Sequence, residues 1–209
     1  MRLTTGSLEL GRGLVFGLLI TMTAATGMLI PETAAGTEWA TDVAGYAPGM
    51  VDDTPTAPYR DPSNALGAPD YDGQGHCTDC TFVSLGRGGS LTVTFSVPFS
   101  GGGTTSGDIL VYEIGPSVEH TYVQVSVDGI SWHSVGTATA DSYSSINIDD
   151  NGFGPDARLY FVRLIDIADQ GQQTGTNLGA DIDAVGVVNT HAPTPVEQWT
   201  WGGIRALYR

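Results

Sequence analysis

The sequence predicts an all-β fold, a two-sheet jelly-roll sandwich of about eight strands. Three observations predict it. Short runs of alternating polar and apolar residues recur from residue 81 onward, turn-forming segments separate them, and no amphipathic helix of useful length interrupts them. Long polar connections between the runs favour a jelly roll over a simple meander. The chain has 209 residues, 41% of them hydrophobic, which suffices for one domain with a buried core and terminal extensions.

The predicted strands follow one another at regular intervals along the chain. They are 81–86, 90–97, 108–114, 120–128, 131–137, 143–148, 159–166 and 181–188. In the turn GRGG, at 86–89, the glycines permit a tight reversal that leaves Arg87 exposed at its tip. In VQVSVDGISWHSVG, at 123–136, the Asp-Gly pair predicts a hairpin with a tight turn because it supplies positive φ values.

The N-terminus indicates export. Two arginines precede the apolar run 14–30, and small residues at Thr33 and Ala35 follow it as a cleavage site. The apolar run is short for a permanent span, and an uncleaved anchor is the alternative. We therefore expect a signal peptide at 1–35, a β-sandwich domain at 36–188, and a Pro-rich linker with an aromatic-basic tail at 189–209. Since no second apolar run of spanning length follows, we expect a mature chain without a membrane span, secreted or held at the cell surface.

The charge balance is strongly acidic. The chain has 23 acidic and 8 basic residues, a net charge of −15, and all of its basic residues are arginine. Nucleic acid is therefore not expected as a partner, because phosphate binding needs clustered cations. Most of the acids are aspartates, which occur in turns and in oxygen-ligand metal sites.

The only two cysteines, Cys77 and Cys80, are three positions apart in GHCTDCTF. In an exported protein the expected state is a small-loop disulfide, and the alternative without a functional role is a pair of free thiols. A redox motif would need an adjacent βαβ pattern, which the sequence lacks. A zinc site with His76 would need a fourth ligand that the spacing does not supply.

Motifs of catalysis are missing. The sequence contains no G-x-S-x-G elbow and no H-E-x-x-H helix, and its four histidines lie singly in strands or loops. We therefore predict that the protein is not an enzyme. Paired carboxylates for glycoside hydrolysis need only spatial proximity, so a secreted hydrolase stays as a minor alternative.

Acidic residues stand at the ends of three predicted strands. Acidic strand ends that meet at one rim of a sandwich would form a hard-oxygen site suited to calcium. The candidate ligands are Asp108, Glu113, Asp166, Asp181 and Asp183. Alternation places Asp108 and Glu113 on opposite faces of their strand, so both could bind one ion only if the strand has a bulge. The alternative is turn chemistry with solvated negative charge.

The last strand, GADIDAVGVV at 179–188, begins with two aspartates and ends with branched apolar residues. Regular alternation puts Asp181 and Asp183 on the same face as Val185 and Val187. The apolar half then anchors the strand in the core, while the carboxylates lie at the rim. Asp183 is expected to be the more buried of the two acids because it is further into the strand.

Several segments, in this order, resemble a family of exported bacterial cell-surface proteins whose domain is similar to the discoidin or galactose-binding-like jelly roll. They are YRDPSNALGAPD (59–70), VSLGRGGSLTVTF (83–95), GDILVYEIG (107–115), VQVSVDGISWHSVG (123–136), FVRLID (161–166) and GADIDAVGVV (179–188). The five candidate metal ligands match acidic positions of that family. Its members commonly carry a C-terminal sorting or anchoring segment, and the ending WGGIRALYR is similar to a terminal signature of some exported bacterial proteins.

The resemblance implies a binding activity. It suggests a non-catalytic module for carbohydrate or another cell-envelope polymer, often beside a structural calcium ion. Tyr59, Tyr112 and Trp132 are the candidates for an aromatic surface that stacks on a sugar ring, although strand alternation also suits Tyr112 and Trp132 as core residues. The alternative function is a structural surface or matrix protein that is assembled or anchored through its C-terminal tail.

Overall fold

The computed structural model describes residues 36–52, 54–71, 79–103, 107–115, 119–139, 143–170 and 174–191. The predicted signal peptide and residues 192–209 of the predicted tail lie outside these ranges. Within them the chain forms ten antiparallel strands in two sheets, which confirms the all-β prediction. The strands are β1 (Glu38–Trp39), β2 (Asp42–Ala47), β3 (Val83–Ser84), β4 (Ser90–Phe99), β5 (Ile109–Glu113), β6 (Thr121–Ser126), β7 (His133–Ala138), β8 (Tyr143–Ile146), β9 (Leu159–Asp166) and β10 (Asp181–Val187).

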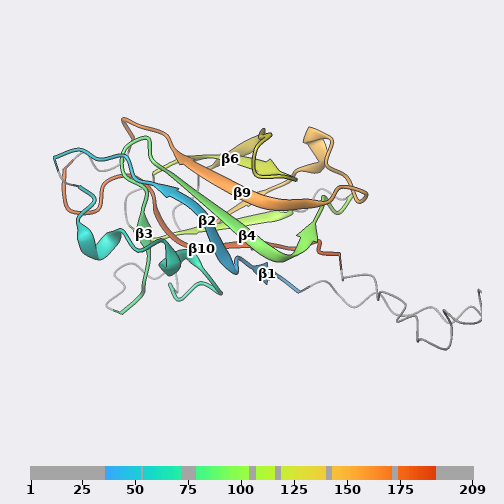
Figure 1. Ribbon diagram of the computed structural model, residues 1–209, viewed down its shortest axis with the longest axis horizontal. Helices are drawn as coiled ribbons and strands as arrows, with labels where there is room; N and C mark the ends of the chain where they lie inside the picture. Colours follow the sequence, from blue (N-terminus) through green and yellow to red (C-terminus); the bar gives the residue numbers. More distant parts are fainter. Residues whose placement is uncertain are drawn as a thin grey trace, which may run out of the picture. The chain divides into compact units, whose positions relative to one another are not determined.

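The two sheets have five strands each. The first has the order β1-β10-β5-β8, with β3 also paired to β10, and the second has the order β2-β4-β9-β6-β7. Figure 1 shows the long strands β4 and β9 running side by side in the second sheet, with β2 next to β4. After β4 the chain changes sheet at every connection except the β6–β7 hairpin, as expected for a jelly roll.

Each of the eight predicted segments contains a strand, and the structure adds two that were not predicted. β1 has only two residues, too few for alternation to be visible, and β2 is an edge strand of mainly small residues, DVAGYA. Between β2 and β3 the described chain forms two short 3-10 turns, η1 (Ala57–Tyr59) and η2 (Pro62–Ala65), and a third, η3 (Asp149–Asn151), precedes β9. In the part of the chain that is described, no helix has the length and apolar character needed to cross a membrane.

The core lies between the two sheets and follows from strand alternation. In the second sheet, alternate residues of each central strand are fully buried, for example Val123 and Val125 in β6 and Val162 and Leu164 in β9. The intervening residues therefore face outward from that sheet. β10 differs because all seven of its residues are buried, since it lies between neighbouring strands and η2 packs against it.

The hairpin at 123–136 is confirmed, but its turn differs from the prediction. β6 ends at Ser126 and β7 begins at His133, so the connection has more than the two residues of a tight turn. Gly129 alone supplies the positive φ, at 72°, because the described non-glycine residues with positive φ are Asp52 and Asp169. Asp128 instead closes the turn with its carboxylate, which accepts hydrogen bonds from the N–H groups of Ile130 and Ser131 at 2.9 and 2.8 Å.

The expected alternation along β10 is wrong at one position. Ile182 pairs with Glu113 and Ala184 pairs with Tyr112, so three residues of β10 face two of β5 and Asp183 occupies a β-bulge. Ile182 before the bulge and Val185 and Val187 after it all belong to the core. The core-facing positions of β10 therefore change from even-numbered to odd-numbered residues at the bulge. Asp181 therefore lies on the opposite face from the two valines.

Candidate functional site

A groove of about 350 Å³ lies on the outer face of the β2-β4-β9-β6-β7 sheet. Its base comes from outward-facing residues of β4 and β9, and its two sides come from β2 and from the β6–β7 connection. The residues that line it are Ala44, Gly45, Thr92, Asp128, Gly129, Trp132, Phe161 and Arg163. A volume of this size lies at the lower end of the range for small-molecule sites.

The space exists because β2 contributes almost no side-chain volume at this point. β2 has a β-bulge at Ala44, between the pairs Val43–Val93 and Gly45–Thr92. A Cβ atom placed on Gly45 would meet nothing closer than 3.9 Å, from Thr92. A larger side chain at Gly45 would therefore enter the groove without displacing the backbone.

The opposite side of the groove is the β6–β7 connection, which is held in one conformation by Asp128. Besides the two turn N–H groups, the Asp128 carboxylate accepts a hydrogen bond from Ser126 Oγ at 3.0 Å. These three hydrogen bonds, of which those from Ser131 and Ile130 act most strongly, lower the pKa of Asp128 to about 2. Asp128 is therefore a permanent anion at the rim of the groove, with Trp132 four residues further along the same connection.

An arginine and two aromatic rings form the centre of the groove. The guanidinium carbon of Arg163 lies 3.6 Å from the centroid of the Trp132 ring, a cation–π arrangement. The Trp132 and Phe161 rings are 6.3 Å apart at an interplanar angle of 74°. Arg163 Nε donates to Thr92 Oγ1 at 3.4 Å, so the side chain is held on both sides.

Arg163 has no carboxylate partner among the described residues. The ion pair that these residues do form joins Arg87 to Asp169, on a different part of the fold. Arg163 is half-buried, and this burial lowers the pKa of its guanidinium. The groove therefore holds a half-buried cation beside two aromatic rings, with the Thr92 hydroxyl at its base and the Asp128 carboxylate at its rim.

The three predicted ligand-binding aromatic residues lie in different places. Trp132 is in the groove. Tyr112 lies in the other sheet between Trp39 and Tyr143, with ring centroids 5.6 and 5.1 Å away. Tyr59, in η1, stacks on Phe82 at 5.1 Å. The structure thus brings only one of the three into the groove, and the sequence prediction missed Phe161, Arg163, Thr92 and Asp128.

The predicted acidic residues are all buried, but they do not form one group. Glu113, Asp166 and Asp181 lie at one end of the sandwich, where β5 and β9 end and β10 begins. We call this region, together with the buried Glu119, the acidic end. Burial is the main cause that raises the pKa of Glu113 to about 10 and that of Asp181 to about 7.

The carboxylates of Glu113, Asp181 and the nearby Asp183 each accept a hydrogen bond from within the protein. Glu113 Oε1 accepts from the N–H of Glu119 at 3.1 Å. Asp181 accepts from the side chains of Ser84 and Asn177. Asp183, the bulged residue, accepts from the N–H groups of Asp70 and Tyr71 at 3.3 and 3.2 Å. Asp183 and Asp181 are 2% and 5% exposed, in the predicted order, although both are buried.

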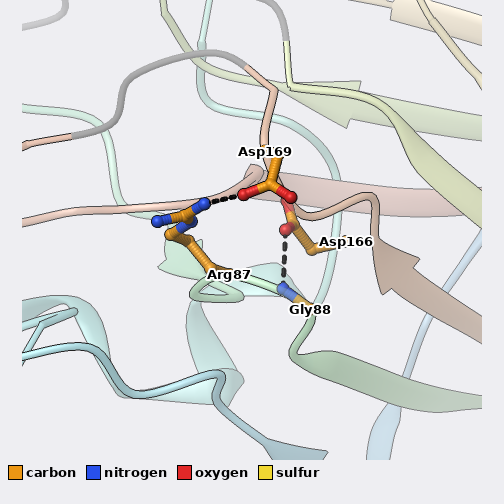
Figure 2. A network of polar contacts seen from close by, with 4 residues as sticks. All are labelled: Arg87, Gly88, Asp166 and Asp169. Atoms are coloured by element: carbon orange, nitrogen blue, oxygen red, sulfur yellow. Dashed lines mark hydrogen bonds and ion pairs between the residues drawn. The ribbon is translucent and has the colours of Figure 1, made fainter.

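Asp166 shows how these contacts hold the fold together. Its two oxygens accept hydrogen bonds from the N–H groups of Gly88 and Ala180 at 2.8 and 2.9 Å. Figure 2 shows the contact with Gly88 next to the ion pair between Arg87 and Asp169. The Arg87 side chain is 27% exposed and paired, so the expectation of an exposed arginine at the turn tip is wrong.

Asp108 lies at the end of β5 opposite to Glu113, away from the acidic end. It immediately precedes β5, whereas Glu113 ends that strand, so five steps along an extended chain separate the two Cα atoms by about 17 Å. Its carboxylate accepts from the N–H groups of Gly102 and Ile148, both at 2.9 Å, and from Asn189 Nδ2. The five predicted ligands therefore do not fit one calcium site.

Metal binding by a subset of the acids stays a prediction. Among residues whose placement is described, no group of three or more His, Cys, Asp or Glu side chains could hold a metal ion. The measurement that decides it is a calcium titration of metal-stripped protein up to about 10 mM, well above the dissociation constants of extracellular calcium modules. A rise in melting temperature that Glu113→Gln abolishes would place an ion at the acidic end. No rise would show that calcium does not bind to the folded protein.

Of the two cysteines predicted to form a disulfide, Cys80 lies within the described residues. Cys80 is disulfide-bonded in the structure. Cys77 and His76 lie outside the described residues, so the pairing of Cys77 with Cys80 stays a prediction.

The fold and the groove together define a β-sandwich with a ligand-sized site on one sheet face. No protein-family model matches the chain, and no curated protein matches it. Among solved structures, a family 35 carbohydrate binding module from an environmental isolate is similar, with 13% sequence identity, over 76% of this chain and 97% of that chain, at a TM-score of 0.31. At this TM-score the likeness says nothing about function, which must follow from the residues of the groove.

Proposed function

We propose that this protein is a non-catalytic module that binds carbohydrate in the groove on the β2-β4-β9-β6-β7 sheet. The observation that carries the proposal is the combination of side chains there: the Trp132 and Phe161 rings beside the guanidinium of Arg163 and the hydroxyl of Thr92. A sugar presents apolar C–H faces and hydroxyl groups on one rigid ring. Aromatic rings complement the former, and charged or hydroxyl side chains hydrogen-bond the latter.

The composition of the groove also supports binding without catalysis. Glycoside hydrolysis uses two carboxyl groups on either side of the scissile bond. Among the described residues, the carboxylate that lines the groove is Asp128, whose pKa of about 2 keeps it ionised at neutral pH and unsuited to donate a proton. Asp128 is also engaged in closing its own turn.

The proposed location is the cell surface or the extracellular space. The support is the N-terminal sequence pattern, a short apolar run followed by small residues. In that setting the module would hold the protein on a glycan or another cell-envelope polymer. The alternative, a structural protein assembled through its tail, depends on residues outside the described ranges. Concentration-dependent assembly that is lost on deletion of residues 196–209 would favour it.

A glycan array tests the proposal. The protein without residues 1–35 is labelled and screened for bound carbohydrates, and the same screen is repeated with Trp132→Ala. We expect the wild type to retain at least one class of glycan and Trp132→Ala to bind it at least tenfold more weakly, since Trp132 supplies a large aromatic surface in the groove. Tyr160→Ala is the matched control because Tyr160 is an exposed aromatic residue of β9 that does not line the groove. Absence of any glycan binding, or equal loss in both variants, would contradict the proposal.

A further inference from the structure

We infer that the groove selects sugars that carry an anionic group, a carboxylate or a sulfate, and that Arg163 is the residue that binds this group. The inference rests on the proposed carbohydrate site and names the substrate class for it. The Arg163 guanidinium is held in one position, and no carboxylate of the described residues pairs with it.

The Arg163 side chain is fixed in a position that leaves one edge of the guanidinium for a ligand. Its guanidinium carbon lies over the Trp132 ring, 3.6 Å from the ring centroid, and its Nε atom donates to Thr92 Oγ1. The two Nη atoms form no hydrogen bond with any described residue, and they are the atoms that face a carboxylate or sulfate in a bidentate pair. An anion bound there would meet a donor pair that is already oriented.

Among the described residues, Arg87 and Arg158 differ from Arg163 because their Nη atoms have acceptors within the protein. Arg87 pairs with Asp169, and Arg158 donates to the carbonyls of Pro155 and Ala157. Arg163 lies instead in a groove, partly removed from water, in a protein with 23 acidic residues. Asp128 lines the same groove but does not pair with Arg163, since its carboxylate is directed to the hairpin turn. Because the half-buried guanidinium keeps donors that no described residue uses, an anionic ligand would complete the site.

The overall charge restricts the kind of anionic ligand. With a net charge of −15, the protein repels a densely charged polymer. At physiological salt this repulsion is screened beyond about 8 Å, whereas the contact with Arg163 is not. We therefore expect the groove to accept an isolated acidic sugar, at a chain end or spaced by neutral sugars, in preference to a continuous polyanion.

The test compares matched sugars in NMR titrations at pH 7 and at about 0.15 M salt. The probes are methyl glycosides of glucuronic and galacturonic acid, the 6-sulfates of glucose and galactose, and the corresponding neutral sugars. In at least one matched set we expect the acidic sugar to bind about tenfold more tightly than its neutral counterpart, which corresponds to about 1.4 kcal/mol. The carboxylate and sulfate probes show which of the two groups the site takes.

Three variants locate the effect. In Arg163→Gln the ratio of acidic to neutral affinity should fall to about one, and in Arg163→Lys it should be intermediate, because the charge stays and the planar fork is lost. Arg158→Gln makes the same change in net charge outside the groove and should keep the wild-type ratio. Circular dichroism and melting curves verify that each variant is folded.

The outcomes separate this inference from the proposed function. Neutral sugars that bind as tightly as acidic ones, with binding that depends on Trp132, would overturn the role of Arg163 and leave the carbohydrate site in place. An acidic preference that persists in Arg163→Gln would overturn it as well. If neither these probes nor the glycan array gives binding in the groove, the proposed function fails and the inference fails with it.

Discussion

The Oδ2 atom of Asp183 accepts a hydrogen bond of 3.2 Å from the backbone N–H of Tyr71, which lies 112 residues earlier in the chain. The contact joins the bulge of β10 to the segment that follows η2. Because Asp183 and Tyr71 are both buried, neither group has ready access to water as a substitute partner. The bulge thus turns the Asp183 carboxylate toward backbone donors.

We therefore predict that Asp183→Ala destabilises the fold by about 1–3 kcal/mol, since it leaves the N–H groups of Asp70 and Tyr71 without their acceptor. Asp150→Ala, at an exposed position in η3, should change the stability by less than about 0.5 kcal/mol. Urea denaturation followed by circular dichroism measures both. Equal midpoints for the two variants would show that the Asp183 contacts do not stabilise the fold.

Asp166, the last residue of β9, and Asp169, three residues further on, should differ in the same way. Asp166 is buried and accepts two backbone hydrogen bonds, so Asp166→Ala is predicted to cost about 1–3 kcal/mol. The Asp169 side chain is 82% exposed and forms only a surface ion pair, so Asp169→Ala should cost less than about 1 kcal/mol. Thermal melts of the two variants at one pH compare them. A larger effect of Asp169→Ala would contradict the positions shown in Figure 2.

The acidic end should make stability depend on pH. Burial raises the pKa of Glu113 to about 10 and that of Asp181 to about 7. A carboxyl with a raised pKa in the folded state binds more protons there than in the unfolded state, so its stabilisation is complete below the unfolded value of about 4 and declines as the pH rises toward the folded value. We expect the melting temperature to fall steadily between about pH 5 and pH 9.

Glu113→Gln isolates the contribution of one group. Glutamine resembles the protonated acid and can still accept from the N–H of Glu119, so the variant should lose part of the decline and be more stable than the wild type at about pH 9. Glu38→Gln makes the same charge change on the edge strand β1 and serves as the control for the loss of one acidic group. Melting temperatures measured across this range for the three proteins would contradict the account if their slopes are equal.

Alternation of polar and apolar residues was sufficient to predict the strands that form the centre of both sheets. It works for β6 and β9 because one face of each strand is buried and the other is not. It misses β1 and β2, which are short, lie at sheet edges or carry small residues. It also misplaces the valines of β10 relative to Asp181, because a bulge changes the parity of a strand and leaves no mark in the residue pattern.

The groove was less predictable than the fold because its residues come from four separate segments. Trp132 was identified from the sequence, whereas Phe161 and Arg163 were not. A usable signal exists: in FVRLID these two residues alternate with the core residues Val162 and Leu164 and must face outward from the sheet. The bulge at Ala44, which makes room for the groove, cannot be predicted from residue types alone.

The central claim is that a carbohydrate occupies the space beside Gly45, and filling that space tests it most directly. Gly45→Leu adds bulk where a Cβ has no neighbour closer than 3.9 Å, whereas Ala47→Leu adds bulk on the same strand outside the groove lining. Binding of the array-selected glycan, measured by calorimetry, should fall by at least tenfold in Gly45→Leu and by less than twofold in Ala47→Leu, with melting temperatures close to the wild type. Unchanged affinity in a folded Gly45→Leu protein would mean that the ligand binds elsewhere.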